Sequence, residues 1–100
     1  MKVLLVCAGG MSTSILMKKM EKYAADQGID FSVSATGINN AAEASTGADC
    51  ILMGPQVSYQ KANVERVVGG IPVGVIPPAD YGIGNCPNIF KHIDSLLASA

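Results

Sequence analysis

The sequence predicts an α/β fold with three layers, in which helices cover both faces of a four-stranded parallel sheet. The first observation behind this prediction is an alternation. Short apolar runs typical of strands are followed by segments whose apolar residues recur at helical spacing. The second observation is size, because 100 residues of which 49% are hydrophobic can bury one core but not two. We therefore expect one domain that spans residues 1–100.

The first strand and the first helix have the clearest patterns. We expect the strand at Lys2–Val6, a run of β-formers that leads into a cysteine. The helix is expected to begin near Ser12 or Thr13, either of which can cap it, and to run to about Gln27. Gly28 then supplies the stop signal. The apolar residues at helical spacing should face the core: Leu16, Met17, Met20 and Ala24.

The next segment is expected to be a strand with one solvent-exposed side. Apolar and polar residues alternate over Phe31–Thr36, which is typical of a strand at the edge of a sheet. A short helix should follow, capped by Asn39 or Asn40, running through Ala44 and ended by Gly47.

The third strand is expected at the centre of the sheet, because every residue of Cys50–Met53 is apolar. The turn Gly54-Pro55-Gln56 closes it. A helix is predicted from about Ser58 to Val68, and Gly69-Gly70 ends it. Its predicted buried face consists of Tyr59, Ala62 and Val67.

The last part of the chain is expected to form a strand, a loop and a helix. The strand should cover Ile71–Ile76, where Pro77-Pro78 ends it. A loop is predicted over Ala79–Asn85, and the final helix from about Asn88 to Ala98. The buried face of this helix is predicted to be Ile89, Phe90, Ile93 and Leu97.

These elements favour the strand order 2-1-3-4, a flavodoxin-like arrangement that low-molecular-weight phosphatases also have. Strands joined through helices are parallel and their crossovers are right-handed. In this order the topological switch point falls between the first and third strands, and ligands bind beyond the carboxyl ends there. Cys7 ends the first strand and Gly54-Pro55-Gln56 ends the third. Topology therefore predicts that these two segments meet.

Charge and hydropathy exclude several classes of function. The net charge is −1 and the pI about 5.6, so we expect neither nucleic acid nor an anionic membrane as a direct partner. The apolar runs have the length of strands, far short of the roughly 20 residues that span a bilayer, so no membrane insertion is expected. Met1-Lys2 leads directly into the first strand without a cleavage site for a signal peptide, which favours the cytoplasm.

The three cysteines favour a reduced protein without a bound metal. The number of cysteines is odd, and no C-x-x-C pair occurs among Cys7, Cys50 and Cys86. Both facts argue against a disulfide framework and a zinc site. We expect no metal and no cofactor. Cys50 is interpreted as a small core residue, and Cys86 as a loop residue beside Pro87 without an assigned role.

Cys7 is the candidate for chemistry, because a glycine turn and a helix start come directly after it. Backbone N–H groups and the positive end of a helix dipole should converge there, which favours a thiolate and a bound phosphate. We predict a nucleophilic cysteine that handles phosphate. The phosphate-binding groups are predicted to be backbone N–H groups, with the hydroxyls of the last two residues, from Ala8, Gly9, Gly10, Met11, Ser12 and Thr13. The alternative is a buried filler beside an ordinary turn.

Two other classes of protein compete with this interpretation. Cys7 and Thr13 have the spacing of the C-x5-R loop of low-molecular-weight phosphatases, with Thr13 at the arginine position. A cysteine phosphatase that uses Asp80 as general acid is therefore the alternative function, weakened by the missing bidentate arginine. The third class is an anion-binding or thiol redox domain, but no resolving cysteine lies near Cys7.

Three segments resemble the EIIB component of the lactose/cellobiose family of the phosphoenolpyruvate-dependent sugar phosphotransferase system. They are the loop Cys7–Ser14, the segment Leu52–Gln56 and the segment Asp80–Gly82. The first loop is similar to that of the cellobiose/chitobiose branch. Chain length and the order of elements also match this family from end to end.

The resemblance implies a phosphotransferase in which Cys7 carries a phosphoryl group. The donor would be a phosphohistidine of the EIIA partner, and the acceptor a sugar held by the membrane-embedded EIIC partner. The implied sugar is a β-glucoside or an N-acetylchitobiose-like disaccharide, and the implied location is the cytoplasm, at the inner face of the membrane through EIIC. Gln56 and Tyr81 are interpreted as a rim of the site, and Met11 with Val57 as an apolar docking patch.

Overall fold

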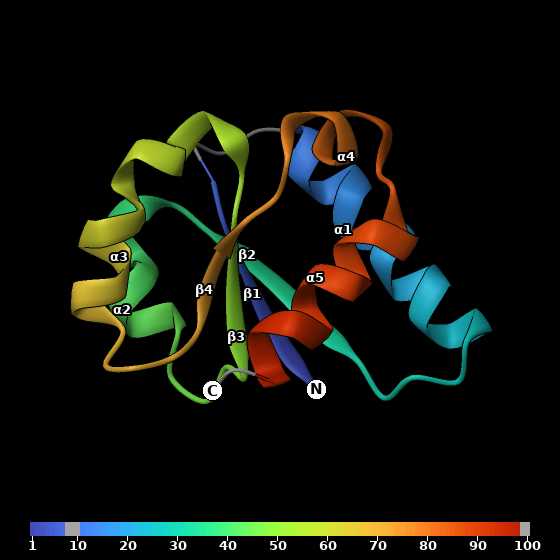
Figure 1. The fold of residues 1–100 in the computed structure, drawn as a ribbon, viewed down its shortest axis with the longest axis horizontal. Coiled ribbons are helices and arrows are strands. Elements are labelled where there is room, and N and C mark those ends of the chain that lie inside the picture. The colour runs from blue at the N-terminus through green and yellow to red at the C-terminus, as the bar shows by residue number, and fades with distance from the viewer. Residues whose placement is uncertain (8–10, 99–100) are drawn as a thin grey trace.

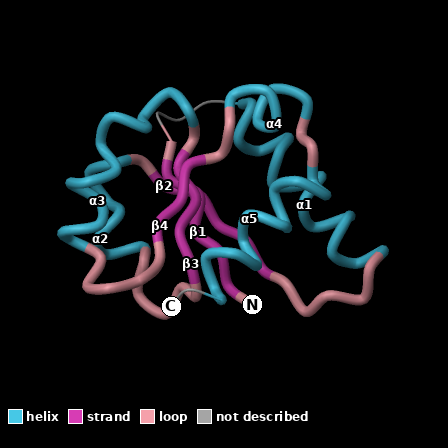
Figure 2. The backbone as a smooth tube through the Cα atoms, viewed as in Figure 1, coloured by secondary structure: helices cyan, strands magenta, loops and turns pink. Residues whose placement is uncertain are grey.

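The computed structural model describes residues 1–7 and 11–98, with the backbone alone for residues 11–13. Its centre is a four-stranded parallel sheet with the order β2-β1-β3-β4, as predicted. Figures 1 and 2 show this sheet nearly edge-on, with helices on both sides. The strands are β1 (Lys2–Val6), β2 (Ser32–Thr36), β3 (Cys50–Met53) and β4 (Val73–Val75).

The helices divide into two groups on opposite faces of the sheet (Figure 1). One face carries α1 (Met11–Asp26) and α5 (Cys86–Ala98), with α4 (Pro78–Ile83) beside the start of α1. The other face carries α2 (Ala41–Ala44) and α3 (Lys61–Val67), each preceded by a 3₁₀ turn, η1 (Ile38–Asn40) and η2 (Pro55–Gln60). No helix among the described residues has both the length and the apolar character needed to cross a membrane.

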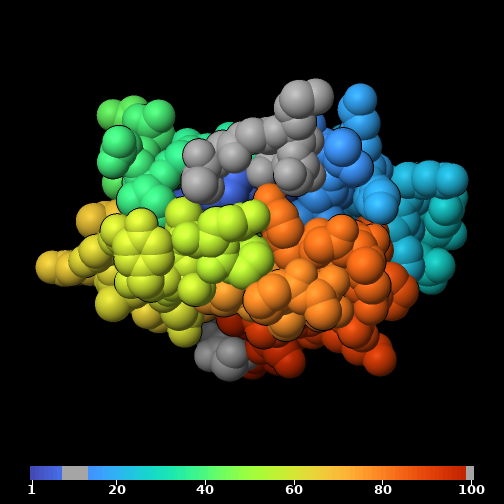
Figure 3. All heavy atoms as spheres, turned by 90° about the horizontal axis from the view of Figure 1, so that it is seen from above, coloured from blue at the N-terminus to red at the C-terminus, as the bar shows by residue number. Residues whose placement is uncertain are grey.

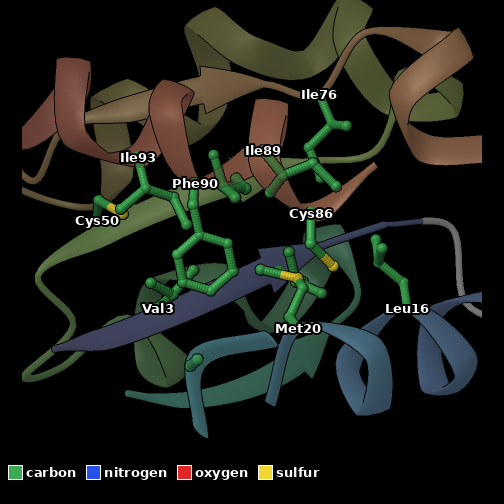
Figure 4. Packing of buried hydrophobic residues seen from close by; sticks show 12 residues of the cluster. Val3, Leu16, Met20, Cys50, Ile76, Cys86, Ile89, Phe90 and Ile93 are labelled. Atoms are coloured by element: carbon green, nitrogen blue, oxygen red, sulfur yellow. The ribbon is translucent and has the colours of Figure 1, made fainter. Parts of the chain in front are cut away.

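Alternation along the central strands creates a separate core on each face. Val3 and Leu5 of β1 point toward α1 and α5, whereas Leu4 and Val6 point toward α2 and α3. The first core contains large side chains, and Figure 4 shows how Met20, Phe90 and their neighbours fill it. The buried residues of the second core are Leu4, Val6, Ala41, Ile51, Met53, Val57, Val64, Val68 and Val73.

The bounds predicted for β1 and β3 are confirmed, and the central position of β3 is explained by its four buried residues. Helix α1 begins at Met11, so the predicted caps Ser12 and Thr13 lie inside its first turn instead of before it. Its end is as expected, because Gly28 has a φ of +70° and the N–H of Ile29 donates to the carbonyl of Ala24 at 2.8 Å.

The second strand lies at the edge of the sheet, as predicted. The following helix differs, because η1 precedes α2 and the Asn40 side chain makes no capping hydrogen bond. Gly47, with a φ of +82°, has the conformation expected of a residue that ends a helix.

The buried face predicted between Ser58 and Val68 is wrong. Tyr59 is 78% exposed and Val67 53% exposed, and Ala62 is exposed as well. The residues that are buried there instead are Val57, Val64 and Val68. The reason is that the helical turns begin earlier, with Pro55 at the start of η2, and Val57 (φ −118°, ψ 15°) interrupts the helical phase before α3.

The fourth strand is shorter than predicted because Pro72 has no N–H to donate to the sheet. Hydrogen bonding nevertheless extends past its ends. The carbonyl of Pro72 accepts from Ile51 at 2.9 Å, and the N–H of Ile76 donates to Met53 at 2.9 Å.

The loop predicted over Ala79–Asn85 is largely a helix. A proline suits the first turn of a helix, and α4 begins at Pro78 and ends at Ile83, with Gly84 as its C-cap at a φ of +65°. Helix α5 then begins at Cys86, before the predicted Asn88, with Asn85 as its cap. The Asn85 side-chain oxygen accepts a hydrogen bond from the N–H of Asn88 at 3.4 Å.

Candidate functional site

Cys7 lies at the carboxyl end of the sheet, directly after β1 and between the ends of β2 and β3. Its N–H donates to the carbonyl of Thr36 at 3.1 Å, which continues the pairing with β2, and the residue is 4% exposed. On the other side, the N–H of Gly54 donates to the carbonyl of Val6 at 2.9 Å. Since α1 begins at Met11, the thiol also lies just before a helix N-terminus. The predicted meeting of the first and third strand ends is confirmed.

Gly54 brings three side chains together. A Cβ atom added to Gly54 would lie 3.4 Å from Cβ of Cys7, 3.5 Å from Cε2 of Tyr81 and 2.7 Å from Oε1 of Gln56. All three side chains therefore surround the same point on the backbone. The structure places the two predicted rim residues, Gln56 and Tyr81, directly beside Cys7.

A hollow of about 470 Å³ adjoins this group, between α1, η2 and α4. Figure 3 looks onto this end of the molecule, where the yellow-green η2 lies against the orange α4 and the blue, described part of α1 lies beside α4. Lys19 is the one charged residue among the described residues of the lining, and its Nζ donates to the carbonyl of Ile83 at 3.4 Å. The described lining residues are Ile15, Leu16, Lys19, Gln56, Tyr81, Gly82 and Gly84.

A second hollow, of about 370 Å³, lies on the other side of Cys7. It is formed by the turn that follows β2 and by η2, and its described lining residues are Cys7, Gly37, Ile38, Asn39, Asn40, Val57 and Tyr59. The end of β1 is thus flanked by two depressions, one on each side.

The sequence around these hollows carries almost no charge. The four segments that follow the strands, 7–14, 37–40, 54–60 and 77–85, contain a single charged residue, Asp80. Its Oδ1 accepts a hydrogen bond from the Asn88 side chain at 3.2 Å, and its carbonyl accepts from the N–H of Asn85 at 2.9 Å. Asp80 therefore joins α4 to α5. A position that holds two helices together does not favour the alternative in which Asp80 acts as a general acid.

The other two cysteines belong to the core. Cys50 is fully buried, as predicted, and burial together with the nearby carboxylate of Asp49 raises the pKa of its thiol to about 11. Cys86 is the first residue of α5 and is buried, so its placement in a loop is wrong. Burial raises the pKa of the Cys86 thiol, and the ammonium of Lys19 partly opposes that effect.

The predicted phosphate-binding residues are only partly within the described structure. Ala8, Gly9 and Gly10 lie outside the described residues. Met11, Ser12 and Thr13 form the start of α1, and their side chains are not described. Their roles in binding phosphate stay predictions.

The prediction of Val57 in an apolar docking patch is wrong, because Val57 is 4% exposed and forms part of the core, whereas the Met11 side chain lies outside the described residues. The exposed apolar side chains at this end are Ile15, Tyr59 and Ile83, which are 56%, 78% and 68% exposed. Sequence reasoning also missed the position of Lys19 in the larger hollow. The signal was its spacing from Ile15, since residues four apart lie on the same side of a helix.

Comparison with known proteins gives a consistent result. The model of the family described as "PTS system, Lactose/Cellobiose specific IIB subunit" matches residues 2–92. The chain is 37% identical to the PTS system cellobiose-specific EIIB component of Lactococcus lactis subsp. lactis, over 95% of this chain and 94% of that protein. It is 36% identical to the galactose-specific EIIB component of Lactococcus lactis subsp. cremoris, with the same coverage. Identity to the oligo-beta-mannoside-specific EIIB component of Bacillus subtilis is 35%, over 98% and 97% of the two chains.

Solved structures agree with this assignment. The cellobiose-specific phosphotransferase IIB component of Borrelia burgdorferi superposes with a TM-score of 0.81 at 32% identity, over 99% of this chain and 93% of that one. The lactose-specific IIB domain of Streptococcus pneumoniae has the same fold, with a TM-score of 0.77 at 17% identity, over 92% and 96% of the two chains. The chain therefore belongs to the lactose/cellobiose-specific IIB subunits of the sugar phosphotransferase system, a family of phosphotransferases.

Proposed function

We propose that this chain is a single phosphocarrier domain in which Cys7 accepts a phosphoryl group from a phosphohistidine of EIIA. Cys7 then passes the group to a sugar bound by the membrane protein EIIC. The observation that carries this proposal is the position of Cys7, at the switch point of the sheet and immediately before the segment that leads into α1.

The chemistry consists of two displacements at phosphorus. In the first, the Cys7 thiolate forms an S–P bond while the P–N bond to the histidine breaks, and the ring nitrogen keeps the electron pair. In the second, a sugar hydroxyl forms an O–P bond and loses its proton, while the S–P bond breaks and the thiolate leaves. Each step requires alignment and stabilisation of the charge on the phosphoryl oxygens.

Backbone amides can supply that stabilisation. We propose that the N–H groups of Ala8 to Thr13, with the hydroxyls of Ser12 and Thr13, bind the phosphoryl oxygens, and that Gln56 and Tyr81 form the rim. The segments around Cys7 contain no histidine or glutamate, and Asp80 is hydrogen-bonded to Asn88. This supports a carrier over a hydrolase, because a hydrolase needs a base that activates water.

The proposed sugar is a β-glucoside or an N-acetylchitobiose-like disaccharide. The resemblance of the Cys7–Ser14 loop to the cellobiose/chitobiose branch supports this choice. The three relatives have cellobiose, galactose and oligo-beta-mannoside in their names, although their identities to this chain differ by little, at 37%, 36% and 35%. That similarity favours EIIC as the component that selects the sugar. We also propose that the chain works in the cytoplasm and meets the inner face of the membrane through EIIC.

The test is to incubate the protein with phosphorylated EIIA and follow thiol-linked phosphate by mass and by ³¹P NMR. We expect one phosphoryl group, stable in the absence of EIIC. The Cys7→Ser variant should fold normally and accept none from the same donor. The matched control is Cys86→Ala, which should accept it as the wild type does.

Two outcomes would contradict the proposal. Undiminished labelling of the Cys7→Ser variant would exclude Cys7 as the acceptor. Rapid release of inorganic phosphate from the labelled wild type would show a phosphatase instead of a carrier.

A further inference from the structure

The side chain of Gln56 lies folded back over the turn that follows β3. Its Oε1 lies 2.7 Å from the position where a Cβ atom of Gly54 would be, so the carboxamide fills the space that the missing side chain leaves. Cys7 approaches the same position, with its Cβ at 3.4 Å. The Gln56 carboxamide can therefore lie near Cys7 only because residue 54 is a glycine and has no Cβ atom.

This amide is available to bind a ligand. Gln56 is exposed and lines the larger hollow, and its side chain makes no hydrogen bond to another described residue. The oxygen of the Gln56 carboxamide is turned toward Gly54, and its two N–H donors have no hydrogen-bond acceptor among the described residues. A phosphoryl group on Cys7 would bring acceptor oxygens to the side of Gly54 on which the Gln56 carboxamide lies.

We propose that the Gln56 carboxamide donates a hydrogen bond to the phosphoryl group on Cys7 and so stabilises the phosphocysteine. This inference rests on the proposed function and assigns Gln56 a role beyond that of a rim residue. The ligand is the dianionic phosphoryl group itself, and the bond is one between a neutral donor and a charged acceptor, which is stronger than a bond between neutral groups.

The charges around Cys7 support this role for a neutral amide. Lys19 is the one cation among the described residues that line the larger hollow, and its Nζ donates a hydrogen bond to the carbonyl of Ile83. Asp80 is the one acidic residue in the segments that follow the strands, and its carboxylate accepts a hydrogen bond from the Asn88 side chain. A carboxamide adds a donor without adding a base, and so it binds the phosphoryl group without activating water to attack it.

The experiment measures how the phosphoryl group is shared between EIIA and this chain at equilibrium. An interaction made only in the phosphorylated protein changes this end-point, whereas a residue that merely helps the two proteins dock changes the rate of approach alone. We expect Gln56→Ala to shift the end-point toward phosphorylated EIIA by about 10- to 100-fold, as expected for a lost hydrogen bond to a charged group. Gln56→Glu should shift it further, because its carboxylate repels the phosphoryl oxygens.

The matched control is Gln60→Ala. Gln60 lies on the same 3₁₀ turn, but its side chain accepts a hydrogen bond from Asn63 on α3 at 2.5 Å, away from Cys7. This variant should leave the end-point unchanged.

A second variant displaces Gln56 without altering it. Gly54 has φ −66° and ψ 152°, which alanine adopts without strain, but the new Cβ would drive away the Gln56 carboxamide. We expect Gly54→Ala to shift the end-point as Gln56→Ala does, and the double variant to be no worse than Gln56→Ala alone. Such non-additivity is the signature of two changes that remove one interaction.

The proposal is overturned if Gln56→Ala and Gln56→Glu both share the phosphoryl group as the wild type does. It is equally overturned if the effects of Gly54→Ala and Gln56→Ala add. Failure of the proposed function itself looks different, because EIIA would then leave the wild-type protein unlabelled.

Discussion

The two faces of the sheet are built in different ways. The face of α1 and α5 is covered by helices of 16 and 13 residues, and its core brings three aromatic rings together. The Phe90 ring lies 4.9 Å from that of Tyr23 and 5.0 Å from that of Phe31. The face of α2 and α3 has helices of 4 and 7 residues over a core without aromatic side chains among its described members.

This difference suggests that the two faces have different roles, one in stabilising the fold and the other in presenting variable side chains beside the site. Long helices with large buried side chains fix the position of β1 and of the start of α1, which frame Cys7. The opposite face uses short turns, and it is there that η1 and η2 present exposed polar side chains beside the site. The first face is expected to dominate the free energy of unfolding, and the second to tolerate sequence changes.

The largest expected effect comes from Phe90→Ala, which removes the ring that joins α5 to the chain around Tyr23 and Phe31. We expect the free energy of unfolding to fall by about 3–5 kcal/mol. On the other face, truncation of a buried valine to alanine, Val64→Ala, removes only two methyl groups. The free energy of unfolding should then fall by about 1–2 kcal/mol. Urea denaturation of both variants measures the difference, and equal losses would refute the division of labour between the faces.

An intermediate effect concerns pH and the α1–α5 face. The pKa of Cys50 is raised from 9.0 to about 11 in the folded protein, so the folded state keeps its proton over a range where the unfolded state loses it. The free energy of unfolding should therefore be unaffected below pH 9 and fall as the pH rises from 9 through 11. Cys50→Ala should reduce this slope relative to the wild type. An identical slope in the variant would show that the thiol contributes nothing.

The smallest expected effect concerns α4, which has no buried residue and contacts the α1–α5 core through the partly buried Tyr81. Gly82 lies inside this helix with open space around it, so Gly82→Ala should stabilise the protein by about 0.5–1 kcal/mol. Gly84 has a φ of +65°, and a Cβ there would lie 2.7 Å from Cδ of Lys19, so Gly84→Ala should destabilise it. Thermal unfolding of the pair tests whether local backbone preference governs this helix.

The parts of the fold that could be predicted are those in which apolar and polar residues follow a clear pattern. A run of four apolar residues, Cys50–Met53, favours the centre of the sheet and the half-polar strand before it favours an edge, so the observed order was the simplest prediction. The residues of α1 have helical spacing over several turns, and Gly28 ends them. The meeting of Cys7 with Gly54 followed from topology alone.

The parts that could not be predicted depend on local phase or on side-chain position. The buried face of α3 depends on the conformation of Val57, which shifts the helical phase by an amount that spacing does not reveal. Pro78 and Gly84 look like loop residues, but Pro78 begins α4 and Gly84 is its C-cap. The position of Gln56 over Gly54 depends on how one flexible side chain folds back, and no residue pattern encodes that.

The nearly uncharged surroundings of Cys7 have a consequence for the kinetics of exchange between partners. Long-range steering requires charges on both approaching surfaces, and at 0.1 M salt it is largely screened beyond about 10 Å. Because the segments that follow the strands contribute only Asp80 and the described lining of the larger hollow only Lys19, this face offers an approaching partner little to attract or repel it before contact. In the proposed function, encounter then depends on collision and shape, and a partner that has delivered its phosphoryl group leaves without strong electrostatic attraction. Such a surface suits a carrier that must release one protein before it meets the next.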